Sequence, residues 1–273
     1  MGDRSIIKRT GGFTVVELGV AMAVILILAV VSFPYVSGMC SQAREVREMS
    51  GAKRSIAAWL SHATENNGEV LAGYRADPMA QTADGKPLGF PMNARYPYRL
   101  APYLNYELKG SLLVNNQEKL KTEYSISVAP SFGINLTFVG GDYGSGSDLK
   151  PTAENLAQFG NFAVLRVAEI HRPSRLIVFA SARFQDPSLG GQTEGYNAVK
   201  SPYFHGRRWP AAYDEKRPYW EFGNLHFRFR GKAVCAMADG HVEMLSYEDM
   251  LDMTRWSNQA AIEDNPEWTL QPM

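Results

Sequence analysis

Cysteine is nearly absent from this chain of 273 residues, which contains only Cys40 and Cys235. Two thiols are too few for a disulfide-stapled scaffold or for a metal site built from several cysteines. Cys40 follows an apolar N-terminal run and Cys235 lies in a predicted strand far along the chain. A disulfide bond between them stays an alternative, but we favour two unpaired thiols. Stability must then come from packing.

An excess of charge of one sign is also missing, because 28 basic residues balance 28 acidic ones. No whole-protein field attracts DNA, RNA or an anionic surface, so we expect no nucleic-acid partner. The chain also lacks a glycine-rich phosphate loop, a nucleophile elbow and a two-histidine zinc motif. We therefore expect no enzyme activity and no required cofactor.

One long hydrophobic run is present near the N-terminus. Residues 1–12 are polar with three basic side chains, and residues 13–33 are apolar apart from three positions, among them Glu17. These twenty-one residues would form a helix of roughly 30 Å, the thickness of a hydrocarbon core. Because basic flanks stay in the cytoplasm, we expect a cytoplasmic N-terminus and an extracytoplasmic remainder.

A secretory signal peptide has a similar charge pattern, but its small-residue cleavage site follows the apolar run. No convincing site of that kind follows Phe33. The small pair Gly11-Gly12 instead precedes the run. Cleavage there would remove the basic leader and leave the apolar helix in the membrane.

The run KRTGGFTVVEL at positions 8–18 resembles the type IV prepilin cleavage and methylation motif. It joins a basic leader, a glycine before the cut, a phenylalanine after it, and a glutamate four residues beyond that phenylalanine. The resemblance implies that prepilin peptidase cuts between Gly12 and Phe13 and methylates the new amine of Phe13. Pro34 matches the helix-interrupting proline of many pilins, which implies a kink there.

Glu17 is the residue to which we assign the assembly role. A carboxylate in the apolar part of a membrane helix costs about 2.5 to 3.5 kcal/mol on insertion scales and usually has a partner. The resemblance implies that this partner is the amino terminus of a neighbouring subunit, which cleavage at Phe13 exposes. An alternative stays open, in which Glu17 lies at the cytoplasmic interface and reaches water.

Beyond Pro34 the apolar residues recur at every third or fourth position, which predicts an amphipathic helix with one buried face over residues 34–64. Charged residues, Glu45 and Glu48 among them, fill the positions between. A continuous helix from Phe13 to about His62 would be roughly 75 Å long. The predicted buried face consists of Met39, Ala43, Val46, Met49, Ala52, Ile56, Trp59, Leu60 and Ala63.

Residues 65–273 predict a globular α+β head. Thr152 is placed to cap a helix. Asp239-Gly240 between alternating runs indicates a two-residue hairpin within an antiparallel meander. The motif that starts at Ser246 resembles a capping box, and we expect it to open a helix through about Asn258. The predicted strands are 111–114, 123–128, 134–139, 162–165, 176–180, 225–230, 232–238 and 241–245.

The segment Ala238-Asp239-Gly240-His241-Val242 resembles the tail of a large subgroup of prepilin-like proteins, in which nine residues separate a histidine from the Asp-Gly pair that follows it. Phe229 occupies that position here, and the nearest histidine is His226. A metal or acid–base role for His226, Asp239 and His241 stays open. We favour a turn, which explains Asp239 without chemistry.

Calcium is the one metal for which the sequence offers candidate ligands. Asp142 and Asp148 lie in a loop rich in glycine and serine, and calcium prefers several oxygen ligands from a flexible loop. The spacing does not fit the twelve-residue calcium-binding pattern, and no glutamate closes the loop. We therefore favour a plain turn without a metal.

We predict an α+β, pilin-like fold in which a long N-terminal helix packs on an antiparallel sheet. Its parts are a removable leader (1–12), a transmembrane half-helix (13–33), an amphipathic half-helix (34–64) and the head (65–273). We expect a pseudopilin or minor pilin that polymerises into a pseudopilus or type IV pilus-like filament. It would cross the bacterial inner membrane once. Its expected partners are other copies or related subunits, prepilin peptidase and the inner-membrane assembly platform.

Two other functions stay open. One is a membrane-anchored extracytoplasmic binding module that recognises a secreted protein or a surface glycan. The other is a membrane-tethered enzyme that uses Asp239 and a histidine, in which Asp239→Asn would abolish activity. Aromatic side chains outside the predicted helix are candidates for a binding face: Tyr74, Tyr96, Tyr98, Trp209, Tyr219 and Trp220.

Overall fold

The computed structural model describes residues 14–144 and 149–272, except for the side chains of residues 29–38. The chain divides into two units, Met1–Arg44 and Glu45–Met273, which are described separately below. The protein is a mixed α/β chain with a five-stranded sheet.

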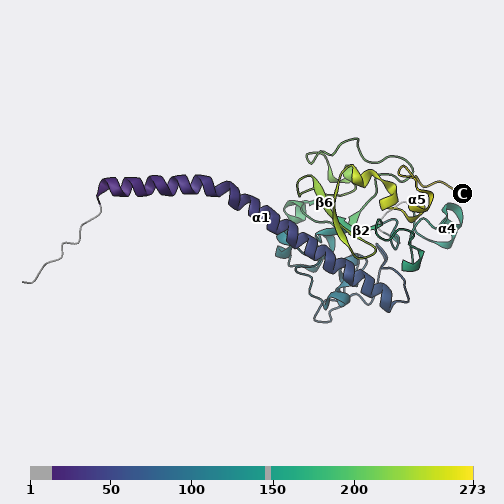
Figure 1. Cartoon of the computed structure of the whole chain (residues 1–273). Coiled ribbons are helices and arrows are strands. Elements are labelled where there is room, and N and C mark those ends of the chain that lie inside the picture. Colours follow the sequence, from purple (N-terminus) through teal and green to yellow (C-terminus); the bar gives the residue numbers. More distant parts are fainter. Residues whose placement is uncertain (1–13, 145–148, 273) are drawn as a thin grey trace, which may run out of the picture. The chain divides into compact units, whose positions relative to one another are not determined.

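Helix α1, Val15–Glu65, is the longest element of the chain (Figure 1). The prediction of one continuous helix to about His62 is confirmed. The backbone at Pro34 is part of this helix, and the predicted kink there stays a prediction. The helix ends where Asn67 and Gly68 adopt positive φ, and the amide of Gly68 donates to the carbonyl of Ala63 at 2.7 Å.

The buried face of α1 agrees with the predicted stripe only in its second half. Ala52, Ile56 and Trp59 are fully buried, but Met39 and Val46 are 68% and 64% exposed. The residue that continues the buried face toward the N-terminus is Glu48, which is 1% exposed. The prediction that Glu48 lies on the charged, solvent-facing side of the helix is wrong, because Glu48 forms an ion pair with Arg228 of the head.

The sheet has the strand order β5-β1-β2-β6-β7. Neighbouring strands are antiparallel except for β1 and β5, which are parallel. The predicted purely antiparallel sheet is therefore wrong at this edge. The strands are β1 Phe132–Asn135, β2 Ile177–Ser181, β5 Ala198–Val199, β6 Lys232–Met237 and β7 Val242–Ser246, and a separate hairpin pairs β3 Phe184–Asp186 with β4 Gly191–Thr193.

Gly133 explains why β5 can pair with β1. A Cβ atom at Gly133 would lie 2.6 Å from the carbonyl carbon of Ala198 and 2.8 Å from the amide nitrogen of Val199. Any side chain would collide with the backbone of β5. Because more than sixty residues separate β1 from β5, the chain has room for the crossover that parallel pairing requires.

The predicted strands 232–238 and 241–245 are confirmed as β6 and β7, and the other strand predictions have mixed outcomes. The predicted strand 176–180 is confirmed as β2, and 134–139 overlaps β1. The predicted strand 123–128 is helix α3, because Thr122 and Ser125 form a capping box at its start. Segments 111–114, 162–165 and 225–230 form only isolated bridges.

The remaining helices are short. Thr152 accepts a hydrogen bond from the amide of Asn155, so the predicted cap of α4 is confirmed. The predicted helix to Asn258 is instead two 3₁₀ turns followed by α5. The bounds are α2 Tyr96–Leu100, α3 Glu123–Val128, α4 Ala153–Phe159, α5 Asn258–Glu263, η1 Ala101–Leu104, η2 Asn115–Lys119, η3 Val167–Glu169, η4 Pro187–Leu189, η5 Tyr219–Phe222, η6 Asp249–Leu251 and η7 Met253–Arg255.

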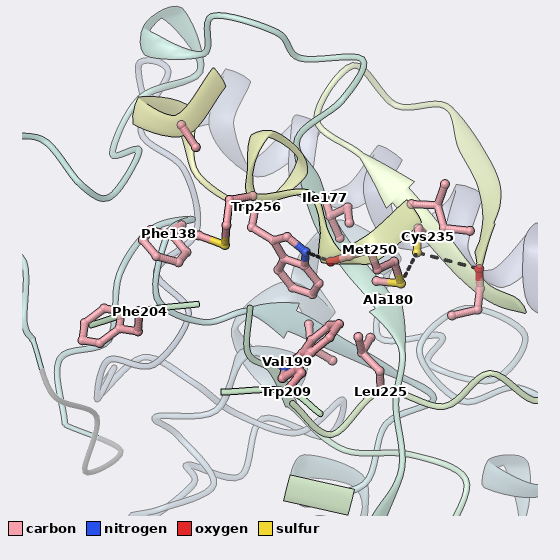
Figure 2. Close-up of a cluster of buried hydrophobic side chains, with 14 of the residues drawn as sticks. Phe138, Ile177, Ala180, Val199, Phe204, Trp209, Leu225, Cys235, Met250 and Trp256 are labelled. Atoms are coloured by element: carbon pink, nitrogen blue, oxygen red, sulfur yellow. Dashed lines mark hydrogen bonds between the residues drawn. The ribbon is translucent and has the colours of Figure 1, made fainter. Parts of the chain in front are cut away.

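Two hydrophobic cores share the sheet between them. In β6, Val234 and Ala236 pack in the core that contains Ile56 and Trp59 of α1. The alternate residue Cys235 packs in the second core with the C-terminal segment. This alternation follows from the two-residue repeat of a strand. Figure 2 shows the second core, where the indole N–H of Trp256 donates to the carbonyl of Met250 at 2.9 Å.

The two cysteines are unpaired, as predicted. Cys40 is exposed, whereas Cys235 is fully buried. Burial raises the pKa of the Cys235 thiol far above its usual range. Cys235 therefore behaves as a small apolar side chain of the core.

No helix within residues 14–144 and 149–272 combines the length and the hydropathy that crossing a membrane requires.

Candidate functional site

The beginning of α1 holds the predicted assembly residue. Gly12 and Phe13 lie outside the described residues, and Thr14 is the first residue within them. The backbone amide and the hydroxyl of Thr14 both donate to Oε2 of Glu17 at 2.8 Å. In return, the amide of Glu17 donates to the hydroxyl of Thr14 at 3.2 Å. This reciprocal pair is a capping box, which the T-x-x-E spacing could have revealed.

The first turns of α1 expose a continuous series of large apolar side chains. Their exposed fractions range from 49% to 87% within the unit to which they belong. Large contiguous apolar surfaces in proteins mark sites of contact with a partner or a membrane. The series consists of Val15, Val16, Leu18, Val20, Met22, Val24, Ile25, Leu26, Ile27 and Leu28.

In the second unit, Glu48 of α1 forms an ion pair with Arg228. The guanidinium contacts both carboxylate oxygens, with Nη2 at 2.6 Å from Oε1 and Nε at 3.0 Å from Oε2. The side chains of Glu48 and Arg228 are only 2% and 7% exposed. Such a buried pair is stable only when further hydrogen bonds satisfy its remaining polar groups.

Those further hydrogen bonds come from the sheet and the segments beside it. The hydroxyl of Ser181 in β2 donates to Oε1 of Glu48 at 2.6 Å. Arg228 donates from Nη1 to the carbonyl of Ala182 at 3.0 Å and from Nη2 to that of Ser131 at 3.2 Å. The network therefore fixes α1 against the sheet by a polar contact that tolerates little displacement.

Two more polar contacts hold α1 to the chain on either side of β6. Arg230 donates to both carboxylate oxygens of Glu45 at 2.7 and 2.8 Å. Lys53 donates to the carbonyl oxygen of Gly240 at 2.5 Å. The tail motif that the sequence singled out is thus a turn that contacts the long helix.

The Asp239-Gly240 turn has a different geometry from the predicted one. The amide of Met237 donates to the carbonyl of His241 at 2.9 Å, so three residues form the loop. Gly240 has φ +91°, whereas Asp239 is not in the positive-φ region. This is a turn followed by a left-handed glycine. The two-residue turn occurs instead at Arg230-Gly231, where φ is +53° and +74°.

The structure separates the residues that we considered for acid–base chemistry. Asp239 pairs with His241, whose Nδ1 lies 2.6 Å from Oδ1 of Asp239. His226 instead contacts Arg228 through Nδ1 at 2.9 Å and Glu215 through Nε2 at 3.1 Å. The Asp239–His241 contact joins two residues of one exposed turn.

Only one of the two calcium candidates lies among the described residues. Asp142 is 1% exposed, and its carboxylate accepts a hydrogen bond from the amide of Gly144 at 2.9 Å. Asp148 lies outside the described residues. Among the residues that the structure describes, no three His, Cys, Asp or Glu side chains gather as metal ligands.

The aromatic candidates divide between the core and one cleft. Tyr96 is buried and donates its hydroxyl to the carbonyl of Phe132 at 2.6 Å, and Tyr98 packs in a small separate cluster. The other four, which are Tyr74, Trp209, Tyr219 and Trp220, line a cleft of about 480 Å³ in the second unit.

Comparison of the chain with protein-family models, with curated proteins and with solved structures finds no match.

Proposed function

We propose that this protein is a structural subunit of a pilin-like filament, either a pseudopilin or a minor pilin. The observation that carries the proposal is the exposed apolar series from Val15 to Leu28, which a single carboxylate, Glu17, interrupts. Burial of apolar surface contributes roughly 25 cal/mol per Å² removed from water. Side chains as exposed as these therefore favour contact with lipid or with the same helix of other subunits.

The route to the filament follows from the prepilin-like motif. Before assembly, the apolar segment holds the protein in the bacterial inner membrane, with the basic leader in the cytoplasm. Prepilin peptidase removes the leader after Gly12 and methylates Phe13. The assembly platform then moves the subunit from lipid to a bundle of equivalent helices, where side-chain packing replaces lipid contact.

Glu17 has two functions in this proposal. Its Oε2 atom caps α1 through Thr14, and all three capping bonds involve Thr14 and Glu17 alone. Cleavage before Phe13 leaves this cap intact. Oε1 makes no hydrogen bond with the described residues and is free to pair with the new amino terminus of a neighbouring subunit. The charge acts between subunits, whereas the cap acts within one.

Two substitutions separate these functions. Glu17→Gln removes the charge but keeps an oxygen that accepts the Thr14 hydrogen bonds, as glutamine does in other capping boxes. Thr14→Ala removes the capping hydroxyl but keeps the charge. We expect Glu17→Gln to reduce the yield of sheared filaments at least tenfold and Thr14→Ala to reduce it less than twofold.

The amount of processed, membrane-extracted subunit must be equal in the three strains, so that assembly alone is compared. If Glu17→Gln forms filaments in wild-type yield, the charge of Glu17 is not needed for assembly. An equal loss in both variants would assign Glu17 to capping alone.

A further inference from the structure

The cleft of about 480 Å³ in the second unit is large enough for a small ligand. Its walls come from segments that are distant in sequence. Phe184 belongs to β3, Tyr196 and Asn197 precede β5, and Tyr219 and Trp220 belong to η5. Such convergence of separate segments on one concave surface is typical of a binding site.

Aromatic rings form one continuous row along this cleft. Tyr196 stacks on Phe184 with ring centroids 4.4 Å apart, and Phe184 meets the edge of Tyr219 at 5.1 Å. Tyr219 in turn contacts Trp220 at 5.0 Å. Trp220 ends the row and is 61% exposed, which is unusual for so large an apolar ring. The row offers flat apolar faces to a ligand.

Asn224 supplies an unpartnered polar group in the same cleft. The residue is 8% exposed, and its side-chain amide has no hydrogen-bond partner among the described residues. The amide atoms of Asn224 remain accessible from the cleft and no described protein group binds them, so they have capacity for a ligand. The hydroxyls of Tyr196 and Tyr219 also make no hydrogen bond there. Burial raises the pKa of both tyrosines, which keeps these hydroxyls protonated donors.

The charged residues of the cleft are all basic. Arg95, Lys200 and Arg208 line it, and the described lining contains no aspartate or glutamate. Arg95 donates to the hydroxyl of Ser127 at 3.1 Å and forms no close ion pair with a carboxylate among the described residues, although the carboxylate of Asp186 lies near enough to feel its charge. Lys200 makes no side-chain hydrogen bond or ion pair with them either. A chain without net charge thus concentrates positive charge in one aromatic cleft.

We propose that this cleft binds an acidic oligosaccharide, that is, a glycan with carboxylates on its sugar rings. The apolar faces of the sugar rings would lie on Trp220 and Tyr219, since flat C–H surfaces suit aromatic rings. Asn224 and the tyrosine hydroxyls would bind ring hydroxyls, and Lys200 and Arg95 would bind the carboxylate. The site adds a glycan-binding function to the head, which is separate from filament assembly.

The test uses the full chain in detergent and isothermal titration with three probes. These are tetragalacturonate, its methyl ester, and tetraglutamate. The ester keeps the sugar but lacks the charge, and the peptide keeps the charge but lacks the sugar. We expect tetragalacturonate to bind at least tenfold more tightly than either, with an affinity that falls as salt rises.

Matched variants locate the binding to the cleft. Lys200→Gln should weaken tetragalacturonate binding about tenfold, whereas Lys121→Gln at an exposed position should not. Asn224→Asp keeps the side-chain shape and the tolerance of positive φ, but faces the anion with a negative charge. It should abolish binding, whereas Asn105→Asp, at an exposed residue that also has positive φ, should not.

Trp220→Ala tests the stacking without disturbing the fold, because Trp220 is largely exposed, and it should weaken binding about tenfold. The proposal is overturned if tetragalacturonate does not bind, if tetraglutamate binds as tightly, or if Lys200→Gln and Trp220→Ala bind like the wild type. These binding measurements do not depend on filament yield. Either proposal can therefore be contradicted while the other stands.

Discussion

The two ends of α1 differ in how much of their apolar surface is buried. Near its beginning, apolar side chains are exposed within their unit, and among the described residues Glu17 forms side-chain hydrogen bonds with Thr14 alone. Near its end, Ile56 and Trp59 are buried and Glu48 is enclosed by partners from the sheet. The second half is therefore built for contacts within the chain. In the first half, large apolar side chains are exposed within their own unit, and our proposal assigns them to contacts between chains.

The largest expected effect comes from breaking the Glu48–Arg228 pair. Arg228→Met leaves the Glu48 carboxylate buried without its counter-charge, which should cost about 3 to 5 kcal/mol of unfolding free energy. Urea denaturation of the full chain measures it. The double variant Glu48→Leu/Arg228→Met removes both charges and should recover most of the loss.

The matched control is Arg172→Met, which removes an exposed pair with Asp264 and should change stability by roughly 0 to 1 kcal/mol. If Arg228→Met costs no more than this control, the network does not fix α1 to the sheet.

The apolar faces of the two halves should respond differently to truncation. Ile56→Ala deletes a fully buried side chain and should destabilise the head by about 2 to 5 kcal/mol. Val20→Ala, at a residue 59% exposed, should leave the unfolding midpoint unchanged. We expect Val20→Ala to lower filament yield instead. A large stability loss in Val20→Ala would contradict the division between the two halves.

The turn that contacts α1 should be sensitive at its glycine. Gly240→Ala forces a side chain into the left-handed region, which should cost about 1 to 2 kcal/mol. The added Cβ would also lie 3.1 Å from Leu60 of α1. Thermal unfolding measures the loss. Asp239→Ala should have a smaller effect, and a larger one would indicate that Asp239 does more than shape the turn.

The smallest expected effect on stability is at Asp249, whose capping hydrogen bonds can be compared with those of Glu17. Ser246 and Asp249 form the same reciprocal hydrogen bonds as Thr14 and Glu17. Hydrogen bonds from the Ser246 backbone amide, and then from its hydroxyl, hold the pKa of Asp249 below its ordinary 3.8. This stabilisation is therefore present above pH 3.8 and is lost as the pH falls through the lower folded pKa.

Asp249→Asn should thus be slightly less stable than wild type at neutral pH, and the difference should shrink below about pH 4. Urea midpoints between pH 6 and pH 3 measure it. A difference that grows on acidification would mean that the sign of the pKa shift is wrong. A small effect here would show that loss of a cap cannot explain a large assembly defect in Glu17→Gln.

Local patterns in the sequence predicted local structure well. The long apolar run and the three-to-four spacing predicted α1, and Thr152 predicted the start of α4. The Asp-Gly pair located the β6–β7 hairpin but not its loop length, because only Gly240 takes positive φ. Segment 123–128 has strand-like residues, but the capping bonds of Thr122 determine a helix.

Contacts between distant segments could not be predicted from the sequence. The burial of Glu48 depends on Arg228, which lies 180 residues away. No spacing in either segment indicates that the two charges meet. The aromatic cleft is similar, since four of the six candidate aromatics converge there only because separate loops fold over one sheet edge. Contacts between distant residues thus determine both sites, and neither site could be predicted from the spacing of residues along the chain.

The most direct test of the filament proposal is the mass and N-terminal sequence of the mature protein. It should be purified from the membranes of cells that have prepilin peptidase. The account predicts a chain that begins at Phe13 with a methylated amino group and lacks residues 1–12. A chain that still begins at Met1 would contradict it, because Glu17 would then have no new amino terminus with which to pair.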